Sequence, residues 1–131
     1  MGNSMIPKTI LFLSGLVASG IGAAILLLPV EFYAANGMEL GGSVSALNEA
    51  RASGGALMAS GALIMIGAFV ARLFFTSAVL ATLLYLAYGL SRVLSMAVDG
   101  MPTDGLLQAT VFEIAVGLVC AVVLFRYRER A

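Results

Sequence analysis

The stretch Y-L-A-Y-G-L-S-R-V-L-S-M-A-V-D, residues 85–99, decides the fold of this chain. It ends a long apolar run, yet polar and aromatic side chains recur in it at steps of three and four: Tyr85, Tyr88, Arg92, Ser95 and Asp99. On a helix this spacing makes one polar stripe along an otherwise apolar cylinder. Because an arginine is costly in lipid, we expect the stripe to face other helices and Arg92 to meet an acid there. The sequence therefore predicts a helical membrane protein built around a polar cluster.

The composition favours a membrane protein over a soluble domain. Of the 131 residues, 61% are hydrophobic and 11% are charged, and the mean hydropathy is +1.05. A soluble domain of this size leaves much of its surface exposed and could not bury so much apolar area. Lipid can cover that surface instead, so the bilayer is the expected partner. The net charge of zero gives no sign of nucleic-acid binding.

The chain offers few groups for metal, cofactor or nucleophilic chemistry. It has no histidine, and its single cysteine, Cys120, lies in an apolar run where cysteine usually packs as a small hydrophobe. One cysteine cannot form an internal disulfide, and the His/Cys sets that bind zinc or haem are missing. The glycine pairs lack the preceding strand of a nucleotide-binding loop. We therefore expect no metal, no cofactor and no catalytic residue.

Long apolar segments divide the chain into four expected spans of a single membrane domain, residues 1–131. Each is long enough to cross a bilayer. Pro29 ends the first, because the residue before a proline disfavours the helical conformation. The extramembrane loop 29–43 mixes charge with aromatic residues, which is typical of a membrane interface and of a short interfacial helix. The expected spans are about residues 7–28, 44–70, 73–98 and 104–125.

The charges near the ends of these spans predict their orientation. Lys8, Arg72 and the arginines of the C-terminal tail fall on one side of a four-pass arrangement, which should be cytoplasmic. The acids Glu31, Glu39, Asp99 and Asp104 fall on the other side. We therefore expect an all-α, integral membrane four-helix bundle with both termini in the cytoplasm.

Four ionisable residues are expected inside the outer half of the bundle: Arg51, Arg92, Glu49 and Glu113. At a rise of about 1.5 Å per residue, Arg92 lies about 10 Å from the end of its helix and Glu113 about 13 Å from the start of its own. We expect Glu113 to form a buried salt bridge with Arg92 or Arg51, in a cluster that is neutral overall. The candidate site residues are Asn48, Glu49, Arg51, Tyr85, Tyr88, Ser91, Arg92, Asp99 and Glu113.

Three interpretations of this polar cluster stay open. As polar glue it would only fix which helices meet and at what depth. As a pocket that opens outward it would hold a ligand, since ionisable groups inside a membrane are candidates for function. As a catalytic site it would use two carboxylates for acid–base chemistry, but no nucleophile, metal set or phosphate-binding loop accompanies them.

Several short motifs resemble one known family. They are Pro29 with Phe32-Tyr33, the run E-A-R-A-S-G-G at 49–55, Arg92, the turn D-G-M-P at 99–102, and Glu113. Together these resemble the bacterial four-span membrane proteins grouped as domain of unknown function 4345, over nearly the whole chain. More distantly, the layout is similar to that of the DoxX-like membrane proteins. The resemblance implies four helices in a bacterial inner membrane and no established reaction.

Each functional hypothesis makes its own structural demand. The main expectation is a non-enzymatic accessory or assembly protein, which associates with itself or with a larger membrane complex. This role requires exposed seams of small residues and a polar cluster without an open cavity. The alternative is a binder or carrier of a small lipophilic or anionic ligand, contacted by Arg51 and Arg92, which requires a pocket reaching the cluster from outside. A membrane enzyme acting through Glu49 or Glu113 requires that Glu113→Gln folds but abolishes turnover.

Overall fold

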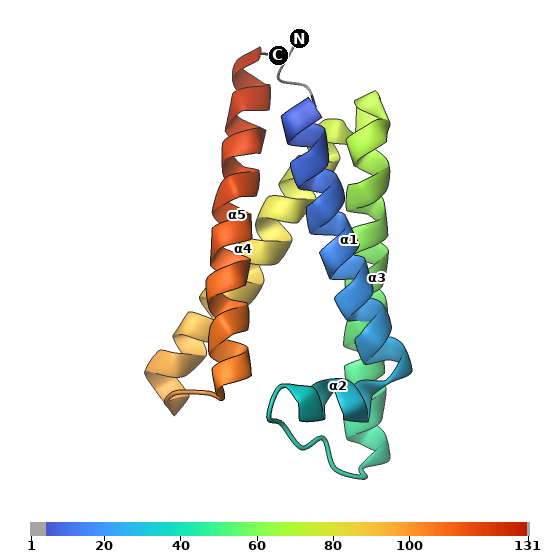
Figure 1. The fold of residues 1–131 in the computed structure, drawn as a ribbon, viewed down its shortest axis with the longest axis vertical. Coiled ribbons are helices and arrows are strands. Elements are labelled where there is room, and N and C mark those ends of the chain that lie inside the picture. Colours follow the sequence, from blue (N-terminus) through green and yellow to red (C-terminus); the bar gives the residue numbers. More distant parts are fainter. Residues whose placement is uncertain (1–4, 131) are drawn as a thin grey trace.

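The computed structural model describes residues 5–130, and the side chains of residues 5–128. Every regular element in this range is helical (Figure 1). The elements are α1 (Met5–Leu27), α2 (Pro29–Ala35), α3 (Val44–Phe69), the short 3₁₀ turn η1 (Ala71–Leu73), α4 (Phe74–Asp99) and α5 (Asp104–Arg130). The predicted all-α fold with four long helices is confirmed.

The four long helices can each cross a bilayer. Within the described residues, they contain windows with a mean hydropathy between 1.6 and 2.3, and no more than 33% of any window is buried inside the protein. A helix needs about 20 predominantly apolar residues to span the hydrocarbon core. Most of their surface is therefore left for lipid, and the chain is a multi-pass membrane protein.

The ends of the helices have local causes. Pro29 follows α1 after the single residue Leu28 and occupies the first turn of α2, where a proline needs no N–H partner. The hydroxyl of Ser43 caps α3 by accepting a hydrogen bond from the backbone N–H of Ala46 at 3.3 Å. Gly100 stops α4 with a φ of +102°, a backbone conformation that favours glycine.

Helix α5 extends beyond the predicted end near residue 125, into the basic tail. The tail contains no glycine or proline that would stop a helix. The ring of Tyr127 also packs against Phe74 and Phe75 at the start of α4, with ring centroids 5.1 and 6.2 Å apart. These aromatic contacts anchor the last turns of α5 to its neighbour.

Helices α1 and α3 pack backbone against backbone. A Cβ atom built on Gly61 would lie 2.5 Å from the backbone nitrogen of Ser19 and 2.6 Å from the carbonyl oxygen of Gly15. One on Gly54 would lie 2.7 Å from the backbone nitrogen of Leu26. Small residues permit this approach, and close van der Waals packing is the main attraction between helices in lipid. The glycine seam therefore joins α1 to α3.

Helices α4 and α5 form the second close pair. A Cβ atom on Gly89 would lie 2.5 Å from Cγ1 of Ile114, and one on Gly117 would lie 2.5 Å from Cδ2 of Leu86. The two pairs are joined through α3 and α4, where the hydroxyl of Ser77 donates to the carbonyl oxygen of Ile64 at 2.6 Å. Each pair is thus a unit, and the contact between α3 and α4 is one of those that connect the units.

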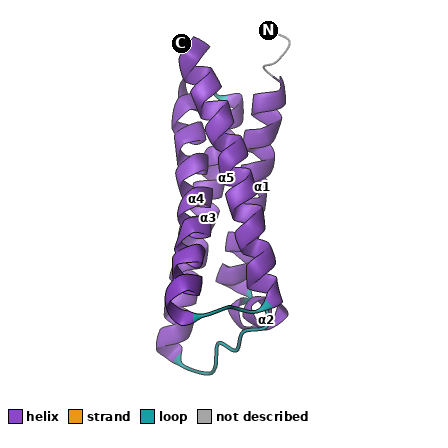
Figure 2. Cartoon of the chain, turned by 90° about the vertical axis from the view of Figure 1, so that its left-hand side faces the viewer, coloured by secondary structure: helices purple, strands orange, loops and turns teal. Residues whose placement is uncertain are grey.

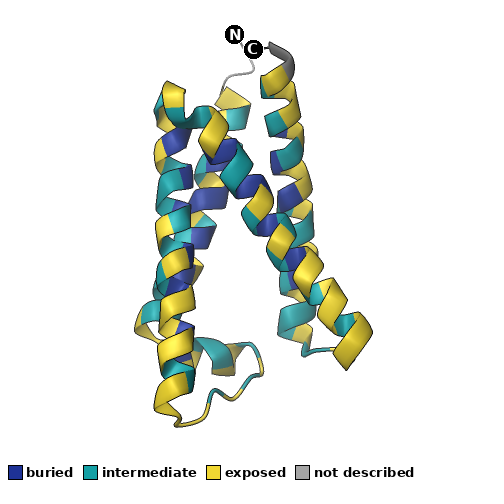
Figure 3. Cartoon of the chain, turned by 180° about the vertical axis from the view of Figure 1, so that it is seen from behind, coloured by how far each residue is buried: buried dark blue, intermediate teal, exposed yellow. Residues whose placement is uncertain are grey.

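The two pairs meet at the end of the molecule that carries both termini and diverge toward the other end, where α2 lies (Figure 1). The fully buried residues cluster where the pairs meet, and exposed residues dominate the diverging part of α4 (Figure 3). From Leu90 to Asp99, α4 has no buried residue. The core cluster at the meeting point is Leu11, Ile64, Ala68, Ala78, Ala81 and Cys120.

A contact between α2 and α5 connects the pairs across the diverging end. The hydroxyl of Thr103 donates to the carbonyl oxygen of Asn36 at 2.7 Å, and Asn36 is the C-cap of α2. Figure 2 shows α2 beside the loop that leads into α5. A Cβ atom on Gly105 would approach Asn36 to 3.0 Å, so this glycine also permits the contact.

Candidate functional site

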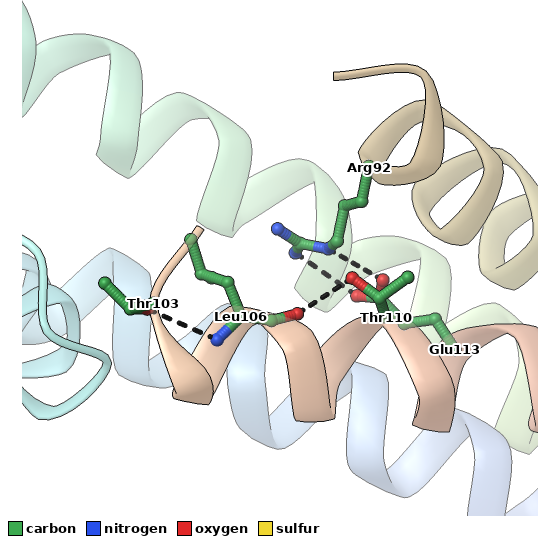
Figure 4. A network of polar contacts seen from close by, with 5 residues as sticks. All are labelled: Arg92, Thr103, Leu106, Thr110 and Glu113. Carbon is green, nitrogen blue, oxygen red and sulfur yellow. Dashed lines mark hydrogen bonds and ion pairs between the residues drawn. The ribbon is translucent and has the colours of Figure 1, made fainter. Parts of the chain in front are cut away.

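An ion pair between Arg92 of α4 and Glu113 of α5 is the centre of the candidate site (Figure 4). Nε donates to Oε1 at 2.8 Å, and Nη2 donates to Oε2 at 3.3 Å. This two-bond arrangement uses the planar fork of the guanidinium group. Gly89, one turn before Arg92, lets Ile114 beside Glu113 approach α4 closely. Of the two partners expected for Glu113, Arg92 or Arg51, the structure shows Arg92.

The ion pair is not buried, which corrects the expectation of a buried salt bridge. The Arg92 side chain is 30% exposed and the Glu113 side chain 15%. The cause is the divergence of the helix pairs, because beyond Gly89 helix α4 runs away from α1 and α3 and has no buried residue up to Asp99. One side of the guanidinium group consequently remains open.

Arg51 does not join this pair, although the sequence suggested that it could. It is an exposed residue of α3, and its Nη1 donates to the carbonyl oxygen of Leu26 at 2.6 Å. Leu26 lies in the last turn of α1, where carbonyl groups lack partners within the helix. An arginine there satisfies such a carbonyl and opposes the negative end of the helix dipole. Arg51 is therefore a cap for α1.

The two tyrosines of the polar stripe have different surroundings. The ring centroid of Tyr88 lies 5.8 Å from Cζ of Arg92, within the range of a cation–π contact. Tyr85 is buried, and its hydroxyl donates to the carbonyl oxygen of Ser14 at 2.6 Å. Tyr88 thus belongs to the Arg92 site, whereas Tyr85 links α4 to α1 in the core.

The remaining predicted site residues lie apart from the ion pair. Asn48 and Glu49 are exposed near the start of α3, and Ser91 is exposed on α4. Asp99 ends α4 and accepts a hydrogen bond from the hydroxyl of Ser95 at 3.2 Å. The structure therefore brings together Tyr88, Arg92 and Glu113, with Asp99 near the end of the same helix.

A small hollow opens beside Arg92, at the end of the bundle far from the termini. Its volume is about 80 Å³, and it is lined by Arg92, Ser95, Met96, Gly100, Pro102 and Leu106. The turn D-G-M-P at 99–102 supplies part of the wall. We name this feature the Arg92 hollow. Sequence reasoning missed most of its wall, although Ser95 lay on the polar stripe and the turn motif was visible.

The first turns of α5 are held in place by hydroxyl groups (Figure 4). The hydroxyl of Thr103 accepts from the backbone N–H of Leu106 at 3.4 Å, and the hydroxyl of Thr110 donates to the carbonyl oxygen of Leu106 at 2.8 Å. Thr110 is buried and satisfied within its own helix. These bonds fix the wall of the Arg92 hollow that α5 contributes.

The Arg92 hollow can recognise a ligand through hydrogen bonds and charge. Nε and Nη2 of Arg92 bind Glu113, and Nη1 makes no hydrogen bond to any residue that the structure describes. Met96, Pro102 and Leu106 add an apolar wall. Among the described residues, no group of three His, Cys, Asp or Glu side chains could hold a metal ion. The site can thus offer guanidinium donors beside apolar surface.

As a cap of α1, Arg51 should stabilise the protein. Arg51→Gln should lower the stability of the protein in detergent by about 1 kcal/mol, because an unpaired carbonyl and an uncompensated helix dipole remain at the end of α1. The melting temperature, read from the thermal loss of monodisperse protein, measures this change. Glu49→Gln, also exposed on α3, is the matched control and should have little effect. Equal melting temperatures for the two variants would contradict the capping role.

Four apolar helices, closely paired and carrying a partly exposed ion pair, define a polytopic α-helical membrane protein. Residues 6–124 match the family described as Domain of unknown function (DUF4345), and the chain belongs to this family. The family resemblance of the sequence motifs is thereby confirmed. No curated protein and no solved structure matches the chain.

Proposed function

We propose that this protein is a non-catalytic binding protein of the bacterial inner membrane, which holds the polar head of an amphiphilic molecule in the Arg92 hollow. The observation that carries the proposal is the hollow itself, which reaches a guanidinium group whose Nη1 has no hydrogen-bond partner among the described residues. Ionisable groups within membrane spans are costly and are often retained for function. A purely structural ion pair would not need an open side.

Two features of the structure favour a ligand-binding protein over an accessory protein. An outward pocket at the cluster was required for a ligand binder, and the Arg92 hollow meets that requirement. An accessory protein was expected to have a polar cluster without an open cavity, which the same hollow does not fit, and the glycine seam that includes Gly15, Gly54 and Gly61 is buried between α1 and α3. The binding hypothesis, with Arg92 but without Arg51, therefore takes first place.

The charge distribution supports an outward-facing hollow. Lys8, Arg72, Arg126 and Arg128 lie toward the end that carries the termini, and the positive-inside rule favours the cytoplasm for that end. Glu31 and Asp104 lie at the opposite end, near the hollow. In this orientation both termini are cytoplasmic, and the hollow opens toward the periplasmic leaflet.

Native mass spectrometry of the detergent-purified protein with added bacterial polar lipid extract tests this function. Ser95→Trp should fill the hollow and reduce bound lipid at least about five-fold, since a bulky ring would exclude the ligand from its contacts. Ser91→Trp is the control, because Ser91 is exposed on the same helix but does not line the hollow. Equal lipid binding by Ser95→Trp and the wild type, or no binding by the wild type, would reject the proposal.

A second candidate, association with another membrane protein, is supported by one observation. Ala52, Ala56 and Ala59 share one face of α3 and are all exposed, which gives a second seam of small residues beside the buried one. Another helix could pack closely there. Ala56→Leu should then reduce a dimer or complex detected by native mass spectrometry, and a wild-type protein that is monomeric and without protein partners would exclude this role.

A further inference from the structure

The charge balance of the Arg92 hollow does not suit a simple anion. Glu113 neutralises Arg92, so the ion pair adds no net charge to the site. Asp99 adds a negative charge near the rim, where it accepts a hydrogen bond from Ser95, a residue of the hollow wall. A free anion that approached Arg92 would therefore meet two carboxylates. A ligand with one negative and one positive group would match the site better.

The unused donor and acceptor positions match the two halves of such a ligand. Among the described residues, Nη1 of Arg92 has no hydrogen-bond partner, and the Nη2–Oε2 bond to Glu113 is long at 3.3 Å. The guanidinium group can therefore donate hydrogen bonds to a phosphate. The carboxylate of Asp99 is exposed and has acceptor positions left beyond its bond to Ser95, so it can accept from an ammonium group. The two groups come from the same helix, two turns apart.

The size and depth of the hollow indicate a headgroup rather than a whole lipid. A volume of about 80 Å³ holds a small polar group but no acyl chain. Helix α4 has 26 residues and is about 39 Å long, which exceeds a hydrocarbon core of about 30 Å. The end of α4 and the turn that follows it, with Gly100 and Pro102 of the wall, therefore lie near headgroup level. Val98 and Met101 expose apolar surface beside them.

We infer that the Arg92 hollow recognises a phosphoethanolamine group, with its phosphate on Arg92 and its ammonium on Asp99. This inference rests on the proposed function of the same hollow and adds the chemical class of the ligand. Phosphatidylethanolamine carries the group as a phosphodiester at the depth of the hollow, and glycerophosphoethanolamine carries the same singly charged phosphodiester group in solution. The acyl chains of a bound lipid would remain in the surrounding bilayer, in contact with the exposed apolar residues of α4 and α5.

Native mass spectrometry with three synthetic lipids of identical acyl chains tests the inference. Phosphatidylcholine keeps the phosphate but has a quaternary ammonium that cannot donate a hydrogen bond, and phosphatidylglycerol has no cation. Phosphatidylethanolamine should bind about two- to five-fold better than either, the range expected for one exposed charge pair. Asp99→Asn should remove this preference, whereas Glu31→Gln, an exposed acid on α2 at the same end, should retain it.

The outcomes separate the inference from the proposed function. If the three lipids bind equally and Ser95→Trp still removes them, the hollow is a binding site but the headgroup inference is wrong. A preference for phosphatidylethanolamine that survives in Asp99→Asn would also overturn the inference. If glycerophosphoethanolamine competes at concentrations equal to the lipid, the headgroup chemistry is supported and the ligand is soluble. If phosphatidylethanolamine binds selectively and glycerophosphoethanolamine does not compete, the ligand is the lipid.

Discussion

Gly61→Val should separate α1 from α3 and lower the melting temperature in detergent by more than about 5 °C. The reason is the absence of room at this position. A Cβ atom there would lie 2.5 Å from the backbone nitrogen of Ser19 and 2.6 Å from the carbonyl oxygen of Gly15. Because these are backbone atoms of a packed helix, they cannot move aside as a flexible side chain would. Overpacking of this kind typically costs about 1–3 kcal/mol, and more where backbones collide.

Gly55→Val is the matched control for this experiment. Gly55 lies in the middle of the same helix, so valine has the same intrinsic helix propensity at both positions. Nothing lies within 4 Å of a Cβ atom built on Gly55. The control should therefore melt close to the wild type. If Gly61→Val and Gly55→Val melted at the same temperature, the glycine seam would not hold α1 against α3.

Removing the charge of Glu113 alone should destabilise the protein more than removing both charges of the ion pair. Glu113→Gln leaves the guanidinium group of Arg92 without a counter-charge in a membrane-spanning helix. Exposed pairs contribute about 0.2–1 kcal/mol, and breaking a buried pair costs about 3–5 kcal/mol. With side chains 30% and 15% exposed, we expect a loss of about 1–2 kcal/mol, between these two ranges.

A double-mutant cycle measures this coupling. Arg92→Gln combined with Glu113→Gln leaves two amides that can hydrogen-bond to each other, and it should recover part of the stability lost in Glu113→Gln. Melting temperatures of the wild type, both single variants and the double variant supply the four values. Strictly additive losses would show that the two side chains do not stabilise the fold through one another.

The helices and the ion pair could be predicted from the sequence because they depend on spacing along the chain. Hydropathy gives four spans, and Pro29 and Gly100 mark helix ends through their backbone preferences. Arg92 and Glu113 have similar depths when counted from the shared turn, so the rise of a helix made Arg92 one of the two expected partners of Glu113. The depth narrowed the choice to Arg92 or Arg51 but did not decide between them.

The partner of Arg51 and the exposure of the ion pair could not be predicted, because the types of the residues do not determine them. The partner of Arg51 is the carbonyl oxygen of Leu26, and every residue has such a carbonyl, so no side chain signals the contact. The sequence placed Arg51 in the same outer half of the bundle as Glu113. The helix that the Arg51 side chain faces could not be derived without knowing where α1 packs on α3. The exposure of the ion pair depends on the divergence of the two helix pairs, a property of the whole arrangement.

The pairing of helices has a consequence for biogenesis. Each close pair consists of consecutive long helices: α1 with α3, then α4 with α5. As the chain leaves the ribosome, each hairpin can complete its principal packing as soon as its second span has entered the bilayer, without waiting for distant segments. The late step of maturation is then the union of two preformed hairpins along α3 and α4.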